Sequence, residues 1–212
     1  MMRSTLLAGL TLLVATLGAA EDAKPLWNGH DLTGWTHVGP GAFVVTDGTL
    51  KTTGGMGLLY WNGGKIENSV VTVVYKNEKR ESNAGVFIRI PEAPTEPWMP
   101  VNKGYEVQIC DSEDDTHVTG VLYSLTTAKA RPGKPGEWNT LEITLDGTRT
   151  RVAVNGALVT DYKEGDPVPP KAKEYEPDRG PRPAAGFIGL QNHDDKDVVY
   201  FKEISVRPLP KK

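Results

Sequence analysis

Three short segments of the sequence carry hydrogen-bonding side chains inside otherwise apolar runs: GVFIRI (85–90), GYEVQICD (104–111) and GFIGLQNH (186–193). Successive side chains of a β-strand point to opposite faces of the sheet. Glu106 and Gln108 therefore share one face of their strand, and Gln191 and His193 share one face of theirs. In the first segment the same alternation sets Arg89 apart from its apolar neighbours.

These five side chains would line a single concavity if the three strands belonged to one sheet, with Tyr123 from GVLYSL nearby. An antiparallel sheet with one solvated face shows the same alternation, so a plain polar surface is the competing interpretation. Gln, Arg, Glu, His and Tyr can orient hydroxyl groups, whereas a merely solvated face tends to carry Lys, Thr and Ser. These side-chain types therefore favour a ligand-binding site over a plain solvated surface.

Metal binding stays open on the sequence alone. The acidic run DSEDDTH, Asp111 to His117, could supply calcium ligands, but it lacks the glycine and the alternating spacing of an EF-hand loop, which favours a solvated turn. His193 with Asp194 and Asp195 could hold a divalent ion, although no strong zinc-ligand spacing is present. A Ser-His-Asp hydrolase is disfavoured because the chain has no GxSxG motif.

The elements that position these residues are predicted to be strands. Short runs rich in Val, Ile, Thr and Tyr recur between Gly, Pro, Asn and Asp clusters, and helical spacing of apolar residues is nearly absent. The predicted strands are Ala42–Thr46, Thr49–Thr53, Gly57–Trp61, Asn68–Lys76, Gly85–Ile90, Tyr105–Asp111, Thr119–Leu125, Trp138–Leu145, Arg151–Val154, Leu158–Tyr162, Phe187–Asn192 and Val199–Val206.

Two tight turns predict antiparallel neighbours: Asp47-Gly48 and Asn155-Gly156, where glycine supplies a positive φ. A dozen strands without crossover helices indicate an all-β, two-sheet antiparallel sandwich of the jelly-roll kind. Two Pro-rich segments, PEAPTEPWMP with Trp98 and DPVPPKAKEYEPDRGPRP, cannot join a ladder and are expected to be surface loops.

Residues 1–20 have the pattern of a secretory signal peptide: one positive charge, an apolar run too short for a membrane span, and small residues ending at Ala20. No cysteine follows that could take a lipid. We therefore expect cleavage after Ala20, a single domain over residues 21–212, and a soluble protein in the periplasm or outside the cell, without a membrane partner.

The composition also bears on which partners and which cross-links to expect. The formal net charge is −3 and no basic stripe is present, which argues against nucleic acid as a partner. Cys110 is the only cysteine, so no internal disulfide can form, and we interpret it as a buried strand residue. The sequence specifies no oligomeric state.

Six motifs occur in order from about Leu26 to Leu209, nearly the whole chain after the predicted cleavage point. They are LWNGHDLTGW, NAGVFIRI, GYEVQICD, TGVLYSL, PGEWNTLEITLDG with VAVNGALV, and GFIGLQNHDDKDVVYFKEISV. Together they resemble the 3-keto-disaccharide hydrolase family. The resemblance implies a concanavalin A-like β-sandwich and action on sugars whose hydroxyl at carbon 3 has been oxidised to a ketone.

Such a ketone acidifies the proton on carbon 2, so that a base can remove it and the resulting enolate can expel the group on carbon 1. Addition of water completes a net hydrolysis. The resemblance thus implies His193 or Glu106 as the base, and Arg89, with a possible divalent metal ion, at the enolate oxygen. Gln108, Gln191 and Tyr123 would bind the small carbohydrate substrate, and Asp111 would orient a neighbour or bind the ion.

Two other functions compete with this hypothesis. A non-catalytic, lectin-like carbohydrate-binding module would use aromatic platforms, for which Trp61, Trp98 and Trp138 are candidates. A conventional retaining or inverting glycosidase needs two carboxylates about 5 to 9.5 Å apart. Glu106 is the one carboxylate that stands out inside a predicted strand, and no partner for it is evident.

Overall fold

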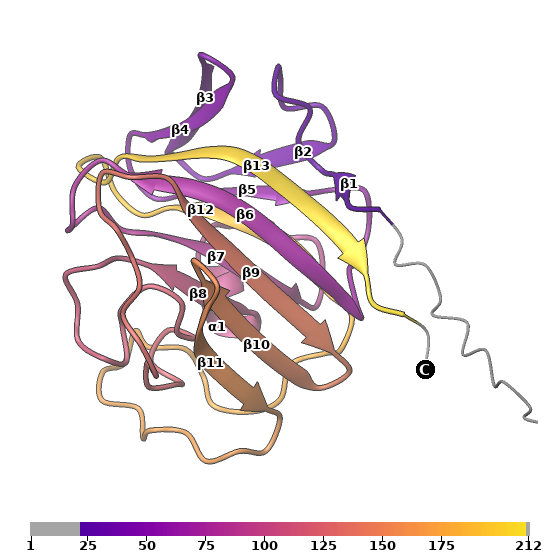
Figure 1. The fold of residues 1–212 in the computed structure, drawn as a ribbon, viewed down its shortest axis with the longest axis vertical. Coiled ribbons are helices and arrows are strands. Elements are labelled where there is room, and N and C mark those ends of the chain that lie inside the picture. Colours follow the sequence, from indigo (N-terminus) through magenta and orange to yellow (C-terminus); the bar gives the residue numbers. More distant parts are fainter. Residues whose placement is uncertain (1–21, 211–212) are drawn as a thin grey trace, which may run out of the picture.

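The computed structural model describes residues 22–210, so the predicted signal peptide lies outside the described part of the chain. Two antiparallel sheets face each other (Figure 1). The larger has the order β11-β10-β9-β6-β13-β4-β3, with β1 added to β13, and the smaller has the order β2-β5-β12-β7-β8. The all-β, two-sheet sandwich predicted from the sequence is confirmed.

The larger sheet comprises β1 (Lys24–Pro25), β3 (Ala42–Thr46), β4 (Thr49–Thr53), β6 (Ser69–Asn77), β9 (Asn139–Asp146), β10 (Arg149–Val154), β11 (Ala157–Lys163) and β13 (Val199–Pro208). The smaller comprises β2 (Trp35–Val38), β5 (Gly57–Trp61), β7 (Ala84–Ile90), β8 (Tyr105–Ile109) and β12 (Phe187–Asn192). The described residues form one α-helix, α1 (Met99–Lys103). No helix among them is long and apolar enough to cross a membrane.

The core lies between the two sheets and follows the predicted alternation. Val71 and Val73 of β6 meet Val86 of β7 and Val107 of β8 in one buried cluster. Each of these side chains is at most 1% exposed. Along each strand of the smaller sheet, the residues next to a core residue point the other way. This sheet therefore presents a second set of side chains on its outer face, including those of β8 and β12.

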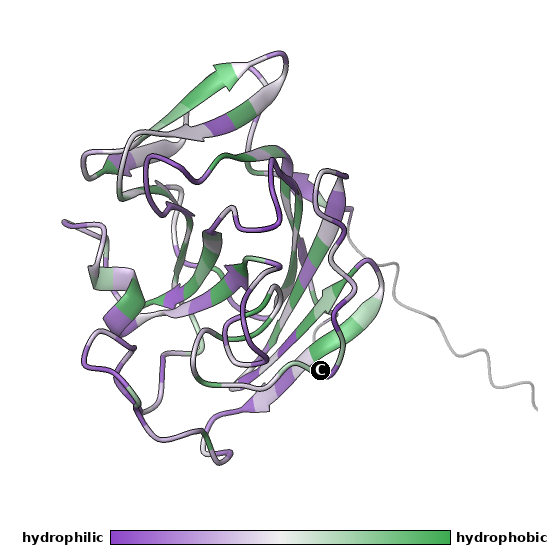
Figure 2. Cartoon of the chain, turned by 90° about the vertical axis from the view of Figure 1, so that its left-hand side faces the viewer, coloured by the Kyte–Doolittle hydropathy of each residue, from purple (hydrophilic) through white to green (hydrophobic). Residues whose placement is uncertain are grey.

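Part of that outer face is apolar and covered. Phe87 of β7 and Leu58 of β5 pack there with Met99 and Val101 of α1. Figure 2 shows this helix on the side of the smaller sheet that faces away from the larger sheet. The Pro-rich segment that leads into this helix was predicted to be a surface loop, and the helix itself was not predicted.

The two predicted turns are confirmed. Asp47 and Gly48 have φ values of 49° and 67°, and Asn155 and Gly156 have 50° and 79°, the left-handed pair that a two-residue hairpin requires. Thr46 pairs with Thr49 and Val154 with Ala157 across them. Both hairpins lie in the larger sheet.

One predicted strand, Thr119–Leu125, is wrong. The segment forms one isolated bridge, between Leu122 and Val107. Other backbone hydrogen bonds also join it to β8, among them Gly120 N–H to Gln108 O, but it turns back on itself through Leu125 N–H to Leu122 O and forms no regular strand. Gly120 and Ser124 have φ values of 90° and 61°, which interrupt an extended chain. The short strands β1 and β2 were missed, because neither carries a sustained β-branched run.

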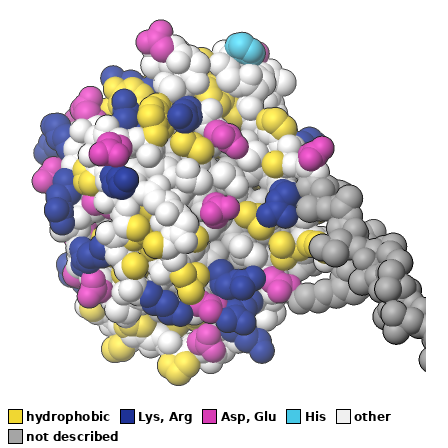
Figure 3. All heavy atoms as spheres, in the orientation of Figure 1, with side chains coloured by type: hydrophobic (Ala, Val, Ile, Leu, Met, Phe, Trp, Pro, Cys, Tyr) yellow, Lys and Arg dark blue, Asp and Glu magenta, His cyan; other side chains and the backbone are white. Residues whose placement is uncertain are grey.

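The outer face of the larger sheet carries charges of both signs, intermingled with apolar side chains (Figure 3). Trp138 lies on this sheet with Lys76 and Lys202 over its ring, at 5.2 and 4.6 Å from the ring centroid. Lysines thus already occupy the ring of one aromatic candidate for sugar binding.

Candidate active site

A cavity of about 360 Å³ opens on the outer face of the smaller sheet. This volume lies within the range of about 300 to 1,000 Å³ that is usual for small-molecule sites. Strands β8 and β12 bring Glu106, Gln108, Gln191 and His193 together, as their alternation predicted. The other lining residues are Asn83, Trp98, Val101, Glu113, Tyr123 and Tyr175.

Glu106 is the buried carboxyl group of this cavity, 7% exposed. Burial raises its pKa to about 8, although the positive charge of His193 and a hydrogen bond from Gln191 act in the opposite direction. Gly85 makes room for this side chain, because a Cβ at that position would lie 2.7 Å from Glu106 Oε1. A carboxyl group with this pKa can exchange a proton near neutral pH.

His193 follows β12 directly and is held by Asp197. Its Nδ1 lies 2.8 Å from Asp197 Oδ2, while Asp197 Oδ1 accepts a 2.9 Å hydrogen bond from the backbone N–H of Asn83. The bond to Asp197 raises the pKa of His193 in spite of partial burial, and the charge of Glu106 adds to the effect. The ring is thus oriented by one nitrogen, which leaves Nε2 available for a ligand.

Two amide side chains of the cavity have unused hydrogen-bonding capacity. Gln108 donates from Nε2 to Asn83 Oδ1 at 3.1 Å, and the Oε1 atoms of Gln108 and Gln191 are buried without a partner among the described residues. A buried polar atom without a partner is costly unless a ligand or water satisfies it. These oxygens are suited to accept hydrogen bonds from sugar hydroxyl groups.

Aromatic residues from loops form the walls. Trp98 is 50% exposed and Tyr175 60% exposed, and each belongs to one of the two predicted Pro-rich loops. Tyr123 also lines the cavity, and its backbone N–H donates to Glu106 O at 2.9 Å, which ties its segment to β8. Burial raises the pKa of Tyr123 to about 12, so it is a neutral donor or acceptor at ordinary pH.

A second cavity of about 250 Å³ continues from the first. The two share lining residues Asn83, Gln108, Glu113, Tyr123 and Tyr175. Asp114, His117 and Lys173 line the second cavity only. We call the first the main cavity and the second the side cavity.

Most of the chain matches a known family. The family model described as a 3-keto-alpha-glucoside-1,2-lyase-like domain covers residues 22–207. The chain belongs to this family. The resemblance seen in the sequence motifs is thereby confirmed. No match was found among the curated proteins.

The fold of this family member also occurs in solved structures. A protein from Parabacteroides distasonis, provisionally described as a glycosyl hydrolase, is 24% identical, with a TM-score of 0.70 over 89% of this chain and 100% of that one. A galectin-like protein from Bacillus subtilis is 13% identical, with a TM-score of 0.65 over 92% and 98%. A Bacillus subtilis carbohydrate-binding module is 15% identical, with a TM-score of 0.56 over 81% and 93%. These structures share the two-sheet fold, and the family match supports a carbohydrate-active role.

Arg89 is not in the cavity, and the role predicted for it at an enolate oxygen is wrong in this structure. The side chain is fully buried, and it donates to Thr150 Oγ1, to Arg149 O, and to the carbonyls of Pro183 and Ala184, at 2.9 to 3.1 Å. Its φ of 55° coincides with a register shift between β7 and β12, so the period-two alternation fails there.

Asp111, which follows β8, also lies away from both cavities. It is 8% exposed, and Gly133 packs so closely on it that no Cβ would fit there. Burial raises the pKa of Asp111, which a hydrogen bond from Thr119 only partly offsets. The predicted contact of Asp111 with substrate or ion at the cavity is therefore wrong.

Several residues of the site were not predicted from the sequence. The most consequential is Asp197, which does not line the cavity itself but orients His193. It stands four residues after His193, in the run HDDKD, and the structure pairs it with the ring in place of Asp195. His193, Asp194 and Asp197 bring three ligand atoms within 4.8 Å of one another, a donor set suited to a divalent cation. Hydrogen bonds to Lys196 and Asp197 and the charge of His193 keep the pKa of Asp194 low despite some burial.

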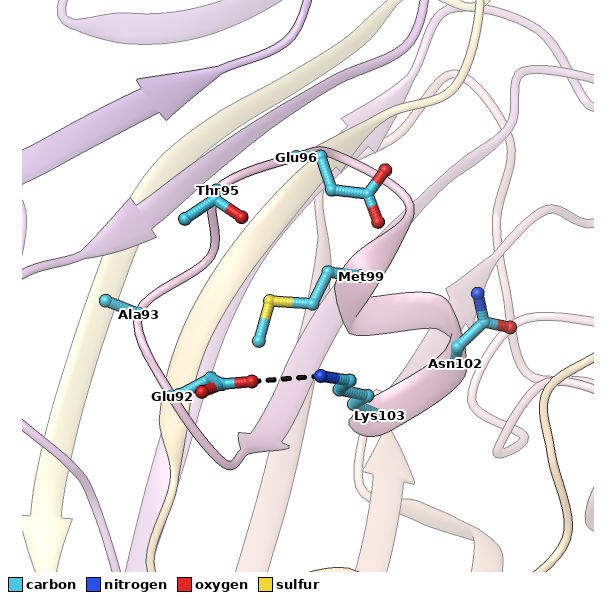
Figure 4. A pocket seen from close by; sticks show the side chains of 7 residues that line it. All are labelled: Glu92, Ala93, Thr95, Glu96, Met99, Asn102 and Lys103. Carbon is cyan, nitrogen blue, oxygen red and sulfur yellow. Dashed lines mark hydrogen bonds and ion pairs between the residues drawn. The ribbon is translucent and has the colours of Figure 1, made fainter.

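A further hollow of about 290 Å³ lies beside α1 (Figure 4). Three charged side chains line it, those of Glu92, Glu96 and Lys103, and all three are exposed. Lys103 Nζ lies 2.9 Å from Glu92 Oε1. Met99 points toward this ion pair. With no buried ionisable group in its lining, this hollow lacks the acid–base chemistry of the main cavity.

Proposed function

We propose that this protein cleaves the glycosidic bond of sugars that carry a ketone at carbon 3, by elimination across carbons 1 and 2 followed by addition of water. The description of its family, which names a 3-keto-glucoside 1,2-lyase activity, supports this substrate class. The observation that carries the proposal is the carboxyl group of Glu106, buried at the floor of the main cavity with a pKa of about 8.

We assign the base to Glu106. A carboxylate that is desolvated and strongly basic takes a proton from carbon more readily than an exposed one of ordinary pKa. The ketone makes the carbon 2 proton acidic, and Gln191 steadies the carboxylate by its hydrogen bond. The substrate would lie with carbon 2 toward Glu106.

His193 takes the role first given to Arg89. Its Nδ1 is fixed by Asp197, so that Nε2 can donate a hydrogen bond to the ketone oxygen as negative charge develops there. A divalent cation held by His193, Asp194 and Asp197 would be an alternative source of positive charge there, because it would replace the proton between Nδ1 and Asp197. Gln108, Gln191 and Tyr123 would hold hydroxyl groups, and Trp98 and Tyr175 would pack on the sugar faces. We expect this activity in an exported protein, in keeping with the predicted signal peptide.

The test is release of a chromogenic alcohol from a 3-keto glucoside by the purified protein lacking residues 1–20. The same glucoside without the ketone is the matched control, and both are assayed with and without chelator. Release from the keto compound alone supports the proposal, and loss on chelation supports a cation at His193, Asp194 and Asp197. Equal release from both glucosides, or none from either, contradicts it.

A carbohydrate-binding module without catalysis is the second candidate. The exposed rings of Trp98 and Tyr175 beside the cavity favour it, as does the likeness to a carbohydrate-binding module in fold. Of the three tryptophans first considered, Trp61 instead packs on Trp35 at 5.7 Å. This candidate predicts calorimetric binding of unoxidised glycan and no turnover of either glucoside.

A further inference from the structure

The elimination proposed above needs a third group, because the alcohol that leaves carbon 1 must gain a proton. Glu106 and His193 are engaged at carbon 2 and at the ketone. The side cavity contains the remaining ionisable groups next to this position: Glu113, Asp114, His117, Tyr123, Lys173 and Tyr175. A leaving group that extends out of the main cavity past Gln108 and Tyr123 enters this space, because both residues line both cavities.

His117 is the side-cavity residue whose geometry suits proton donation. Its Nδ1 lies 2.9 Å from Asp114 Oδ1 and 3.0 Å from Thr116 Oγ1, and its ring packs edge-on against Tyr123 with centroids 4.9 Å apart. Nδ1 and one ring face are thus fixed, while Nε2 takes part in neither hydrogen bond. This repeats the arrangement of His193 with Asp197 at the other end of the site.

A hydrogen-bond partner of the His117 ring is the carboxylate of Asp114. Slight burial of Asp114 is outweighed by hydrogen bonds from Thr116 and His117, which lower its pKa to about 2. Two other groups of the side cavity hold their protons more tightly than they ordinarily would: burial raises the pKa of Tyr123 to about 12, and a hydrogen bond with Tyr175 raises the pKa of Lys173. Glu113 is the remaining competitor, since its carboxyl group lines both cavities.

We propose that His117 is the general acid for the leaving group, and that the side cavity binds that group. This inference rests on the proposed function. In the first half-reaction Glu106 takes the carbon 2 proton, the electron pair forms the carbon 1–carbon 2 double bond, and the carbon 1–oxygen bond breaks as the oxygen takes the proton of His117. In the second, neutral His117 takes a proton from the attacking water, and Glu106 returns its proton to carbon 2. Both residues end as they began.

The side cavity is also selective for the chemistry of the leaving group. Its lining is dominated by amide, carboxylate, imidazole, phenol and ammonium groups, which form hydrogen bonds with a polyhydroxylated ring. The structure therefore points to a sugar or other polyol as the natural leaving group in preference to an aryl or alkyl alcohol. The rings of Tyr123 and Tyr175 provide faces on which such a ring can pack.

The test uses 3-keto glucosides that differ in leaving group: 4-nitrophenol, which departs without a proton, and methanol and glucose, which do not. His117→Gln should lose about 10²-fold or more in kcat on the two poor leaving groups and less than about 3-fold on 4-nitrophenol. Asp114→Asn should also lose more kcat on the two poor leaving groups than on 4-nitrophenol, but by a smaller factor. His30→Gln, an exposed histidine remote from the cavities in sequence, is the matched control and should leave all three rates unchanged.

An equal loss of kcat on all three substrates in His117→Gln would overturn the role of His117. So would the finding that Glu113→Gln, and not His117→Gln, loses more kcat on the two poor leaving groups than on 4-nitrophenol. Circular dichroism and melting curves identify variants that do not fold, and Asp114→Asn then carries the test, since Asp114 is exposed. Failure of the wild-type protein to release any of the three alcohols would overturn the proposed function together with this inference. Release by the wild type without selectivity in any variant would overturn the inference alone.

Discussion

Arg89 on β7 of the smaller sheet donates a 3.1 Å hydrogen bond from Nε to Oγ1 of Thr150 on β10 of the larger sheet. The same guanidinium group holds the carbonyls of Pro183 and Ala184, which precede β12. One buried cation thus joins both layers of the sandwich to the long loop that carries Tyr175. Its task is structural, and its removal should affect folding before it affects chemistry.

Arg89→Ala should lower the free energy of unfolding by roughly 3 to 5 kcal/mol, because several buried acceptors lose their donor. Urea unfolding measures this loss. Arg151→Ala, on the exposed side of β10, is the control and should change the stability by less than about 1 kcal/mol. Normal stability of Arg89→Ala combined with lost turnover would return Arg89 to the active site.

Glu106 should make the protein less stable as the pH rises. Its pKa is about 8 in the folded protein against an ordinary value of 4.5, so the folded state holds a proton that the unfolded state has released. The stability contribution of the neutral form is complete below about pH 4.5 and is lost as the pH rises to about 8. Glu106→Gln should therefore be more stable than the wild type at pH 9 by a few kcal/mol, with little difference at pH 4.

Urea unfolding at the two pH values tests this expectation. Glu142→Gln, on the exposed side of β9, is the matched control without a buried charge to relieve. An equal difference between wild type and Glu106→Gln at both pH values would show that the carboxyl group is not held neutral by burial.

The same titration predicts the pH dependence of the reaction. If Glu106 must be ionised to take the carbon 2 proton, kcat/KM on the 3-keto glucoside of 4-nitrophenol, whose leaving group needs no proton, should rise with pH through about 8. Glu106→Gln should lose about 10²-fold or more of kcat and this limb of the profile. If kcat/KM of a folded Glu106→Gln protein still rose with pH through the same range, the titration would belong to another group.

His193 and Asp197 should act as a unit. His193→Ala should lower kcat by roughly 10² or more, with little change in KM, because the ketone oxygen loses its donor. Asp197→Asn keeps an oxygen to accept from the backbone of Asn83 but removes the charge beside the ring, so it should lower kcat by a smaller factor. The double variant should be no worse than His193→Ala, and additive losses would argue against a shared role.

The loop aromatics should govern binding. Trp98→Ala and Tyr175→Ala should each raise KM by about 2- to 10-fold, the range that follows from about 0.5 to 1.5 kcal/mol for an aromatic contact, while kcat changes less. Trp138→Ala removes a tryptophan from the other sheet and should leave KM unchanged. A KM effect at Trp138 would place a sugar site on the larger sheet.

How far the sequence predicts this site depends on how regular each strand is. Along β8 and β12 the alternation is unbroken, so the shared face of Glu106, Gln108 and Gln191 could be predicted. On β7 the alternation fails at Arg89, where a positive φ and a register shift turn the side chain inward. Nothing in GVFIRI marks that residue, because the shift depends on how β12 pairs with β7.

The remaining misses come from segments without a repeat. A turn brings Asp197 to His193, and another brings His117 to Tyr123. Side-chain contacts made by turns follow no periodic spacing in the sequence, so they could not be predicted from it. The acidic run Asp111 to His117 was interpreted as a solvated turn, which holds for Asp115 but not for His117. The strand predicted at Thr119–Leu125 failed for a related reason, since Gly120 and Ser124 adopt left-handed conformations.

The two Pro-rich loops supply Trp98 and Tyr175, whereas Glu106, Gln108 and Gln191 stand on strands of a sheet. Loops tolerate insertion and exchange far better than paired strands do. Under the proposed function, relatives could therefore differ in the sugars that they accept through changes in these two segments, while the groups proposed to move protons stay in place. Grafting the pair of loops between family members is accordingly a direct route to engineering a new substrate range on an unchanged reaction.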